Sequence, residues 1–262
     1  MTRKTPLFFL HGWAMTPTVW QPLIAALGTE NFECHAPALP GHDGNTTDVK
    51  PSLAAWADAL APALPPAATV IGWSLGALLA LELARTRFEH VERLILLGAT
   101  PRFVSASDWP HGLDAAVVAS FTDGYISQPT QTLSRFLTLQ TLGDASRRQL
   151  LPQLEAAAVP HTGSPLPALA DGLKILTTSD LRPQLAEIRQ PVHLIHGSND
   201  ALMPIEAARQ LATALPRARL TVFEHCGHAP LLSRVDECAA VIGAVWDMKT
   251  PDISPASSFK PR

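Results

Sequence analysis

Residues 70–76 read Val-Ile-Gly-Trp-Ser-Leu-Gly and run directly into the apolar residues 77–81, Ala-Leu-Leu-Ala-Leu. A β-branched run, a G-x-S-x-G motif and a helix-forming segment in this order predict a nucleophile elbow, a sharp strand-to-helix turn that presents the serine at the top of a sheet. The turn forces a strained backbone on Ser74, and Gly72 and Gly76 remove side chains that would collide around it. Ser74 is therefore a candidate nucleophile, and an idle serine in a glycine-rich turn is the alternative.

Composition fits a globular protein and excludes several classes of function. The 262 residues are 47% apolar and 16% charged, which is typical of one domain with few surface charges. A net charge of −3 gives no overall basic field for nucleic acid or an anionic membrane. Three cysteines are too few for a disulfide framework or a zinc site, so we expect a reducing compartment. We also expect neither a metal nor a cofactor. The apolar run at residues 7–10 is too short for a signal peptide, and no segment reaches the ~20 apolar residues of a membrane span, so the sequence predicts a cytoplasmic protein.

Short buried-strand patterns alternate with helical patterns along most of the chain. Apolar, β-branched runs predict strands at residues 7–11, 32–36, 69–72, 93–97, 192–196 and 220–223. Helical spacing of apolar residues predicts helices at residues 20–27, 53–64, 75–87, 205–215 and 235–246. This alternation indicates an α/β fold, in which a mostly parallel sheet is covered by helices on both faces.

Residues 101–182 interrupt the alternation, because their helical patterns are not separated by predicted strands. Helical spacing is clearest in two sets of residues, namely Leu133, Phe136, Leu137 and Gln140, and then Leu150, Leu151 and Leu154. The segment is too long for a simple loop, so we expect an inserted helical cap over the carboxyl ends of the strands. The predicted core then comprises residues 1–100 and 183–248, and the Pro- and Ser-rich residues 249–262 form a disordered tail.

A serine nucleophile needs a base and an oriented acid, which follow it in the chain order Ser, acid, His in folds of this class. Asp200 comes directly after the predicted strand at 192–196, and His228 lies in the loop after the strand at 220–223. Because the carboxyl ends of parallel strands meet at one edge of a sheet, we expect both side chains to lie near Ser74, and we expect Ser74 and His228 to be partly exposed. The alternatives are a turn residue at Asp200 and a surface histidine at 228.

Other acids and histidines compete with this assignment. None of the competing acids directly follows a predicted strand; they are Asp171, Asp180 and Asp236. His225, three residues before His228, is the competing candidate for the base. We expect His42 and His196 to cap turns or contact the backbone.

The tetrahedral intermediate of acyl transfer also needs backbone N–H donors. The residue after the nucleophile, Leu75, supplies one, and a loop after an early strand supplies the other. Residues 9–13, Phe-Leu-His-Gly-Trp, form such a strand end, so we assign the second donor to the Trp13 amide and expect the Trp13 ring to wall the pocket.

Four short motifs together resemble the α/β-hydrolase superfamily over most of the chain, namely His11-Gly12-Trp13, Pro40-Gly41-His42-Asp43, Gly72-Trp73-Ser74-Leu75-Gly76 and Gly227-His228-Ala229-Pro230. Within the superfamily the chain is most similar to the carboxylesterases of biotin synthesis. One reason is the pair Trp13 and Trp73. The more specific reason is a segment similar to their substrate-lining helix, Arg135-Phe136-Leu137-Thr138-Leu139-Gln140.

This resemblance implies an α/β-hydrolase fold and a serine esterase that removes a methyl ester from a pimeloyl chain held by an acyl carrier protein. The implied substrate-binding residues are Trp13, Ser74, Leu75, Phe136, Leu137, Thr138, Leu139, Gln140 and His228. Phe136 and Leu139 would line the acyl channel and Gln140 would offer a polar contact, or the two apolar side chains simply pack the cap onto the sheet. A carrier protein is acidic, so arginines should surround the pocket mouth. The candidates are Arg135, Arg147 and Arg148, for which ordinary solvated charges are the alternative.

Two departures from the family pattern stand out. The chain has Ala77 where the family motif usually continues with a second glycine, and its first strand begins near residue 7, without the usual preceding strand. We expect a monomer. Two other functions stay open, a different serine hydrolase (a broad short-chain esterase, a lactonase or a carbon–carbon bond hydrolase) and a ligand-binding protein that has lost turnover.

Overall fold

A six-stranded parallel sheet forms the centre of the molecule in the computed structural model, which describes residues 4–45, 49–160, 163 and 166–247. The strand order is β2-β1-β3-β4-β5-β6, and every neighbouring pair is parallel. The strands are β1 (Thr5–Leu10), β2 (Phe32–His35), β3 (Ala68–Trp73), β4 (Val91–Leu97), β5 (Val192–Gly197) and β6 (Ala218–Phe223). All six predicted strands are confirmed, with ends within two residues of those expected. The predicted tail lies outside the described residues.

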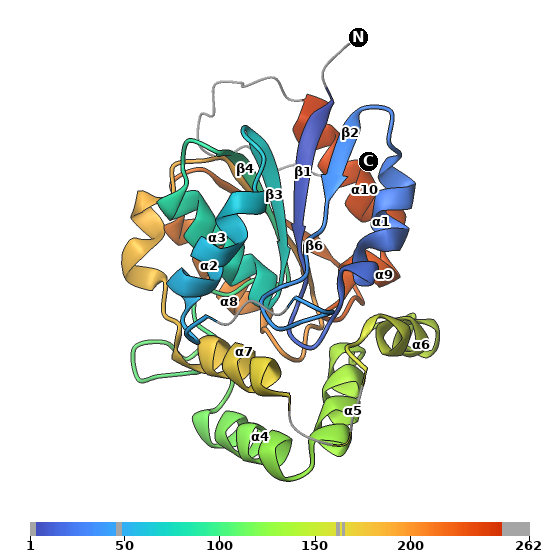
Figure 1. Ribbon diagram of the computed structural model, residues 1–262, viewed down its shortest axis with the longest axis vertical. Helices are drawn as coiled ribbons and strands as arrows, with labels where there is room; N and C mark the ends of the chain where they lie inside the picture. Colours follow the sequence, from blue (N-terminus) through green and yellow to red (C-terminus); the bar gives the residue numbers. More distant parts are fainter. Residues whose placement is uncertain (1–3, 46–48, 161–162, 164–165, 248–262) are drawn as a thin grey trace.

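Strand side chains alternate between two apolar cores, one on each face of the sheet. Phe8 and Leu10 of β1 pack on one side, whereas Leu7 and Phe9 pack on the other. The first core is covered by α2 (Leu53–Leu60), α3 (Leu75–Thr86) and α8 (Ile205–Ala214), and the second by α1 (Gln21–Leu27) and α10 (Val235–Asp247) (Figure 1). The prediction of a parallel sheet covered on both faces is confirmed.

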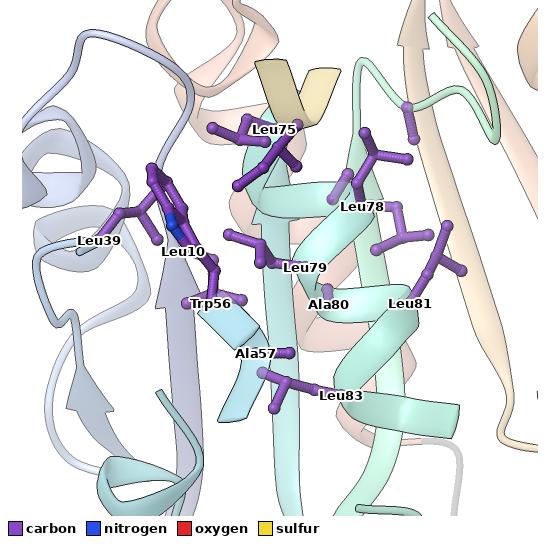
Figure 2. Packing of buried hydrophobic residues seen from close by; sticks show 14 of the residues in the cluster. Leu10, Leu39, Trp56, Ala57, Leu75, Leu78, Leu79, Ala80, Leu81 and Leu83 are labelled. Carbon is purple, nitrogen blue, oxygen red and sulfur yellow. The ribbon is translucent and has the colours of Figure 1, made fainter. Parts of the chain in front are cut away.

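Helix α3 is almost wholly buried because it runs down the middle of the sheet. Figure 2 shows its residues Leu79 and Leu83 beside Trp56 and Ala57 of α2. Two-sided burial explains why residues 75–84 read as a continuous apolar run with one buried glutamate rather than an amphipathic pattern. Glu82 forms an ion pair with Arg85 at 2.8 Å, which satisfies the buried carboxylate.

Helix ends differ slightly from the sequence prediction where prolines occur. The expected helix at 53–64 is α2 followed by a short 3₁₀ helix, Ala61–Ala63, which contains Pro62. The expected helix at 20–27 is likewise preceded by a 3₁₀ helix, Pro17–Trp20. The sequence did not predict the 3₁₀ helix Arg182–Glu187 or the four-residue α9 (Pro230–Ser233), which are too short to show a helical period.

An inserted helical cap lies at the end of the sheet where the strands terminate (Figure 1). It contains α4 (Ala115–Ser127), α5 (Pro129–Gln140), α6 (Arg147–Ala157) and α7 (Pro167–Thr178). The described residues between 101 and 182 add no strand to the sheet and form only isolated bridges. The predicted cap is confirmed, and its exact boundaries stay a prediction. None of the helices in the described part of the chain combines the length and apolar character needed to cross a bilayer.

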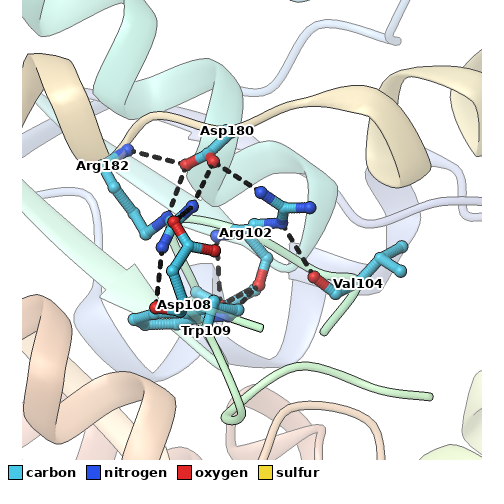
Figure 3. A network of polar contacts seen from close by, with 7 residues as sticks. Arg102, Val104, Asp108, Trp109, Asp180 and Arg182 are labelled. Atoms are coloured by element: carbon cyan, nitrogen blue, oxygen red, sulfur yellow. Dashed lines mark hydrogen bonds and ion pairs between the residues drawn. The ribbon is translucent and has the colours of Figure 1, made fainter. Parts of the chain in front are cut away.

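A network of hydrogen bonds and ion pairs holds residues 102–109, in the loop that leads into the cap (Figure 3). Asp180 accepts hydrogen bonds from Arg102 at 2.8 Å and from Arg182 at 2.7 Å. Arg182 also donates to Asp108 at 3.1 Å and lies over the Trp109 ring. These contacts hold the pKa of Asp180 at about 2, chiefly through the hydrogen bonds from Arg182. Because the charges of these arginines are neutralised by carboxylates, we interpret the network as structural.

Candidate active site

Ser74 occupies the sharp turn between β3 and α3, with φ 58° and ψ −117°. This conformation is strained for a residue with a side chain and confirms the expected elbow. Its amide donates to the Leu97 carbonyl at 3.1 Å, which ties the elbow to β4. The flanking glycines are required sterically, since a Cβ on Gly72 would lie 2.4 Å from the Gly76 oxygen and a Cβ on Gly76 would lie 2.1 Å from the Leu10 oxygen.

Asp200 and His228 are hydrogen-bonded to each other at the carboxyl end of the sheet. The Nδ1 of His228 lies 2.7 Å from the Oδ2 of Asp200. The other oxygen, Oδ1, accepts from the amides of Leu202 and Met203, both at 2.9 Å. Asp200 is thus both a turn residue and the partner of His228, so the two interpretations of its role coexist.

Electrostatics keep Asp200 in its ionised form. Burial by itself raises the pKa of the carboxyl group, but the neighbouring His228, with its hydrogen bond, and the further contacts of His196 and Met203 outweigh it and leave the pKa below its usual value. A carboxylate in this position can fix the imidazole with its Nδ1 protonated, and the Nε2 of that tautomer is free to accept a proton.

His228 lies against the elbow that carries Ser74. The indole Nε1 of Trp73 donates to the His228 carbonyl at 2.8 Å, and the two rings are 5.7 Å apart between centroids. Gly98 leaves room for the imidazole, because a Cβ there would be 3.0 Å from its Cε1 and Nδ1 atoms. The Nε2 of His228 is buried and has no hydrogen-bond partner among the described residues, which leaves this atom available as a base.

The expectation that Ser74 and His228 are partly exposed is wrong, since they are only 4% and 1% exposed. The cap is the reason. The end of α5 reaches the histidine loop, where the Gln140 carbonyl accepts from the His228 amide at 3.1 Å.

The two amides assigned to the oxyanion hole lie at adjacent strand ends, at the start of α3 and after β1. Within the described residues, neither the Trp13 nor the Leu75 amide donates to a backbone or side-chain acceptor. The Trp13 indole donates to the Leu169 carbonyl at 2.7 Å, and its ring packs edge-on against Tyr125 and Phe136 of the cap. The ring is buried against the aromatic side chains of the cap, as a core aromatic residue is.

The competing residues lie elsewhere or contact the backbone. Asp180 is held by two arginines, and His225 is exposed. His42 contacts the Pro40 carbonyl at 3.0 Å, as expected for a turn histidine. His196 contacts the Met203 carbonyl at 2.7 Å, also as expected, but it lies 3.4 Å from Asp200 as well. This second contact was not predicted from the sequence, although a histidine four residues before the acid, at the end of the same strand, is a signal for it.

An apolar pocket lies under the cap, next to Leu202 of the Asp200 loop. Its volume is about 450 Å³, including the solvent at its mouth, and it is lined by Phe103, Leu113, Val117, Val118, Phe121, Phe136, Leu139, Leu173, Leu176 and Leu202. Phe136 and Leu139 therefore face the pocket, one helical turn apart on α5. Leu137 packs instead in the second core, and the Thr138 hydroxyl donates to the Ser134 carbonyl. The buried Gln140 side-chain amide has no partner for its nitrogen among the described residues.

The three candidate carrier-binding arginines are exposed on the cap. Arg135 lies on α5, and Arg147 and Arg148 begin α6. None of the three forms an ion pair with another described residue. Among the residues that the structure places, no group of His, Cys, Asp and Glu side chains is arranged to hold a metal ion.

Comparison with known proteins identifies relatives along most of the chain. The model of the alpha/beta hydrolase family matches residues 7–241. A pimeloyl-(acyl-carrier protein) methyl ester esterase of Aromatoleum aromaticum is 48% identical over 91% of this chain and 97% of its own length. An esterase of the same name from Nitrosomonas europaea is 41% identical over 91% and 94%.

Solved structures share the fold at lower identity. The esterase EaEST from Exiguobacterium antarcticum superposes with a TM-score of 0.81 at 19% identity, covering 94% of this chain and 93% of its own. The enol-lactonase from Burkholderia xenovorans superposes with a TM-score of 0.79, also at 19% identity, covering 94% and 92%. Together with the family match over residues 7–241, these comparisons show that the chain belongs to the α/β hydrolase family.

Proposed function

We propose that the protein is a serine carboxylesterase in which Ser74 is the nucleophile, His228 the general base and Asp200 the orienting acid. The observation that carries the proposal is the 2.7 Å Asp200–His228 hydrogen bond beside a serine held at φ 58°, with the opposite imidazole nitrogen unpaired. A base oriented on one side and free on the other is what activation of a hydroxyl requires.

The reaction proceeds through an acyl-enzyme. The Ser74 oxygen attacks the ester carbonyl while its proton passes to the Nε2 of His228, and the amides of Trp13 and Leu75 bind the oxyanion. The intermediate collapses as the carbon–oxygen bond to the alcohol breaks, and His228 returns the proton to the departing alcohol. Water then attacks the acyl-enzyme with His228 again as base, which releases the acid and restores Ser74.

The proposed substrate is the methyl ester of pimeloyl-acyl carrier protein, and the products are pimeloyl-acyl carrier protein and methanol. Relatives up to 48% identical over nine-tenths of the chain carry this activity in their names. The apolar pocket under the cap suits a methylene chain, and the exposed arginines Arg135, Arg147 and Arg148 suit an acidic carrier. The similarity of the chain to the carboxylesterases of biotin synthesis supports a role for this reaction in that pathway.

Comparing methyl pimeloyl-carrier protein with free methyl pimelate tests the substrate assignment. We expect the carrier-linked ester to have a kcat/KM at least about tenfold higher, because docking of the carrier adds contacts outside the pocket. Equal values would contradict the role of the carrier and favour a broader short-chain esterase. Labelling by a fluorophosphonate that is lost in Ser74→Ala tests the serine mechanism separately, and an unlabelled wild type would favour a binding protein.

A further inference from the structure

The connector between α5 and α6, residues 141–146, contacts both loops of the proposed catalytic site. The side-chain amide of Asn199, next to Asp200, donates to the Gly143 carbonyl at 3.0 Å. The Ala145 amide donates to the His225 carbonyl at 2.9 Å. The approach is close, since a Cβ on Gly143 would lie 2.4 Å from the Cβ of Asn199. The connector therefore joins the cap to the acid loop and to the histidine loop.

Asp144 is the centre of this connector. It is 7% exposed, and both of its carboxylate oxygens accept hydrogen bonds. Oδ1 accepts from the Ser146 amide at 2.7 Å, a local bond at the start of α6. Oδ2 accepts from the Gly227 amide at 3.0 Å and from the Ser233 hydroxyl at 2.7 Å. Gly227 immediately precedes His228, and Ser233 ends α9, so the carboxylate holds the chain on both sides of the histidine.

A role limited to helix α6 does not explain these contacts. A helix-start aspartate needs only nearby amides, as Asp114 shows at the start of α4, where one oxygen accepts from Ala116 and Val117. Asp144 instead reaches residues 83 and 89 positions away. No arginine or lysine of the described chain forms an ion pair with it. Burial of an unpaired charge is costly unless several donors satisfy it, and here three do.

We propose that Asp144 is a positioning residue, which holds the loop of His228 so that the imidazole stays between Asp200 and Ser74. The inference rests on the proposed serine mechanism. The connector makes the cap a support for the catalytic histidine as well as a cover for the pocket. Because a displacement of about 1 Å at a catalytic group can cost about 100-fold in rate, loss of this support reduces turnover more than binding.

Steady-state hydrolysis of p-nitrophenyl acetate tests this role, because so small an ester makes little use of the acyl pocket. We expect Asp144→Ala to lower kcat by about 10- to 100-fold while KM changes by less than about threefold. The pH midpoint of kcat/KM, which reports the free enzyme's base, should also shift, because the imidazole is less firmly held by Asp200. Asp144→Asn retains one acceptor oxygen, so its kcat should lie between those of Asp144→Ala and the wild type.

Asp114→Ala is the matched control, because it removes a helix-start aspartate of the cap that touches neither catalytic loop. It should leave kcat within about twofold and the pH midpoint unchanged, even if the melting temperature falls. An Asp144→Ala variant that behaves like Asp114→Ala in kcat and pH midpoint overturns the proposal. If Asp144→Ala does not fold, Asp144→Asn and Ser233→Ala test the proposal in its place. A wild-type kcat and a wild-type pH midpoint in both of these variants would overturn it. Full activity in Ser74→Ala would contradict the serine mechanism itself, whereas an inactive Ser74→Ala beside an unaffected Asp144→Ala would contradict only this inference.

Discussion

The elbow and the cap both border the proposed catalytic centre, but they are held together in different ways. At the elbow, backbone meets backbone, and Gly76 leaves no space for even one carbon atom beside the Leu10 carbonyl. The cap is held through side-chain contacts. For example, Trp13 of the core packs edge-on against three aromatic rings of the cap, those of Phe121, Tyr125 and Phe136. Rings of this kind can repack, whereas a backbone contact at this distance cannot.

This difference separates two tasks of the fold. The elbow has to hold one serine in a strained conformation, so its neighbours are fixed by sterics. In the proposed function the cap encloses an acyl chain, and an apolar pocket lies between α4, α5 and α7, with Leu202 of the Asp200 loop on one side. We therefore expect changes at the elbow to abolish activity or folding, and changes in the cap to adjust substrate use.

The largest expected effect is on turnover at the elbow. Ser74→Ala should lower kcat for ester hydrolysis by about 10⁴-fold or more, because the nucleophile is lost. The melting temperature should change by less than about 3 °C, since one oxygen atom is removed from an otherwise unchanged turn. Steady-state kinetics and a thermal melt measure both quantities, and near-wild-type turnover would show that another residue is the nucleophile.

Folding itself should fail when a methyl group is added at the elbow. We expect Gly76→Ala to destabilise the protein by more than about 3 kcal/mol, because its Cβ would lie 2.1 Å from the Leu10 carbonyl oxygen of β1. Gly243→Ala in α10 is the matched control, as a Cβ there meets nothing within 4 Å. That variant should gain about 0.5–1 kcal/mol from helix propensity. Similar unfolding free energies for the two variants would contradict the steric argument.

A paired truncation compares the two apolar regions directly. Phe8→Ala in β1 should lower the free energy of unfolding by about 3–5 kcal/mol, because the ring is fully enclosed by the first core. Phe136→Ala should cost about half as much, since this ring faces the pocket on one side. The cap variant alone should raise KM for a pimelate ester. Denaturant unfolding and kinetics on both variants test this, and equal costs would indicate that the cap is packed as tightly as the sheet.

Acid should lower the free energy of unfolding through the buried histidines His11 and His42. Burial lowers the pKa of His11 to about 3 and of His42 to about 4, with the neighbouring His42 adding to the shift at His11. The folded state keeps these groups neutral while the unfolded chain takes up protons below about pH 6.5, so stability falls as the pH drops from 6.5 towards 4. The slope per histidine is at most about 1.4 kcal/mol per pH unit.

Urea unfolding between pH 7 and 4.5 measures this slope. His42→Gln, which cannot take up a proton, should reduce the slope by up to one histidine's share. A slope identical to that of the wild type would show that His42 does not contribute.

The smallest expected effect concerns the surface of the cap. Arg135→Glu should raise KM for the carrier-linked ester by about three- to tenfold, since rim charges act mainly on association. Hydrolysis of p-nitrophenyl acetate should not change. Arg189→Glu, an exposed arginine that precedes β5 rather than lying on the cap, is the control and should change neither. A carrier KM that is unaffected by Arg135→Glu would mean that this arginine does not contact the carrier.

Local sequence was most informative where the chain has least freedom. Residues 70–76 predicted the strand, the strained serine and the helix, because a turn so tight admits few residue types. Asp200 and His228 were predicted from chain order, because parallel strands bring their carboxyl ends to one edge. The cap was predicted as helical, but its apolar pocket and the face of α5 that lines it depend on how the three helices α4, α5 and α7 pack together.

The parallel sheet and the elbow could be predicted from the amino-acid order alone, because strand and helix periods and turn sterics are local properties. The Asp200–His228 pair could be predicted because it follows from the order of the parallel strands along the chain. The folded structure was needed to show that Ser74 and His228 are buried, that His196 approaches Asp200, and that Asp144 contacts the loop of His228. The burial of Ser74 and His228 and the contacts of Asp144 involve residues distant along the chain, so they exist only after the cap packs against the sheet. The approach of His196 to Asp200 depends on how the turn after β5 folds back on its own strand.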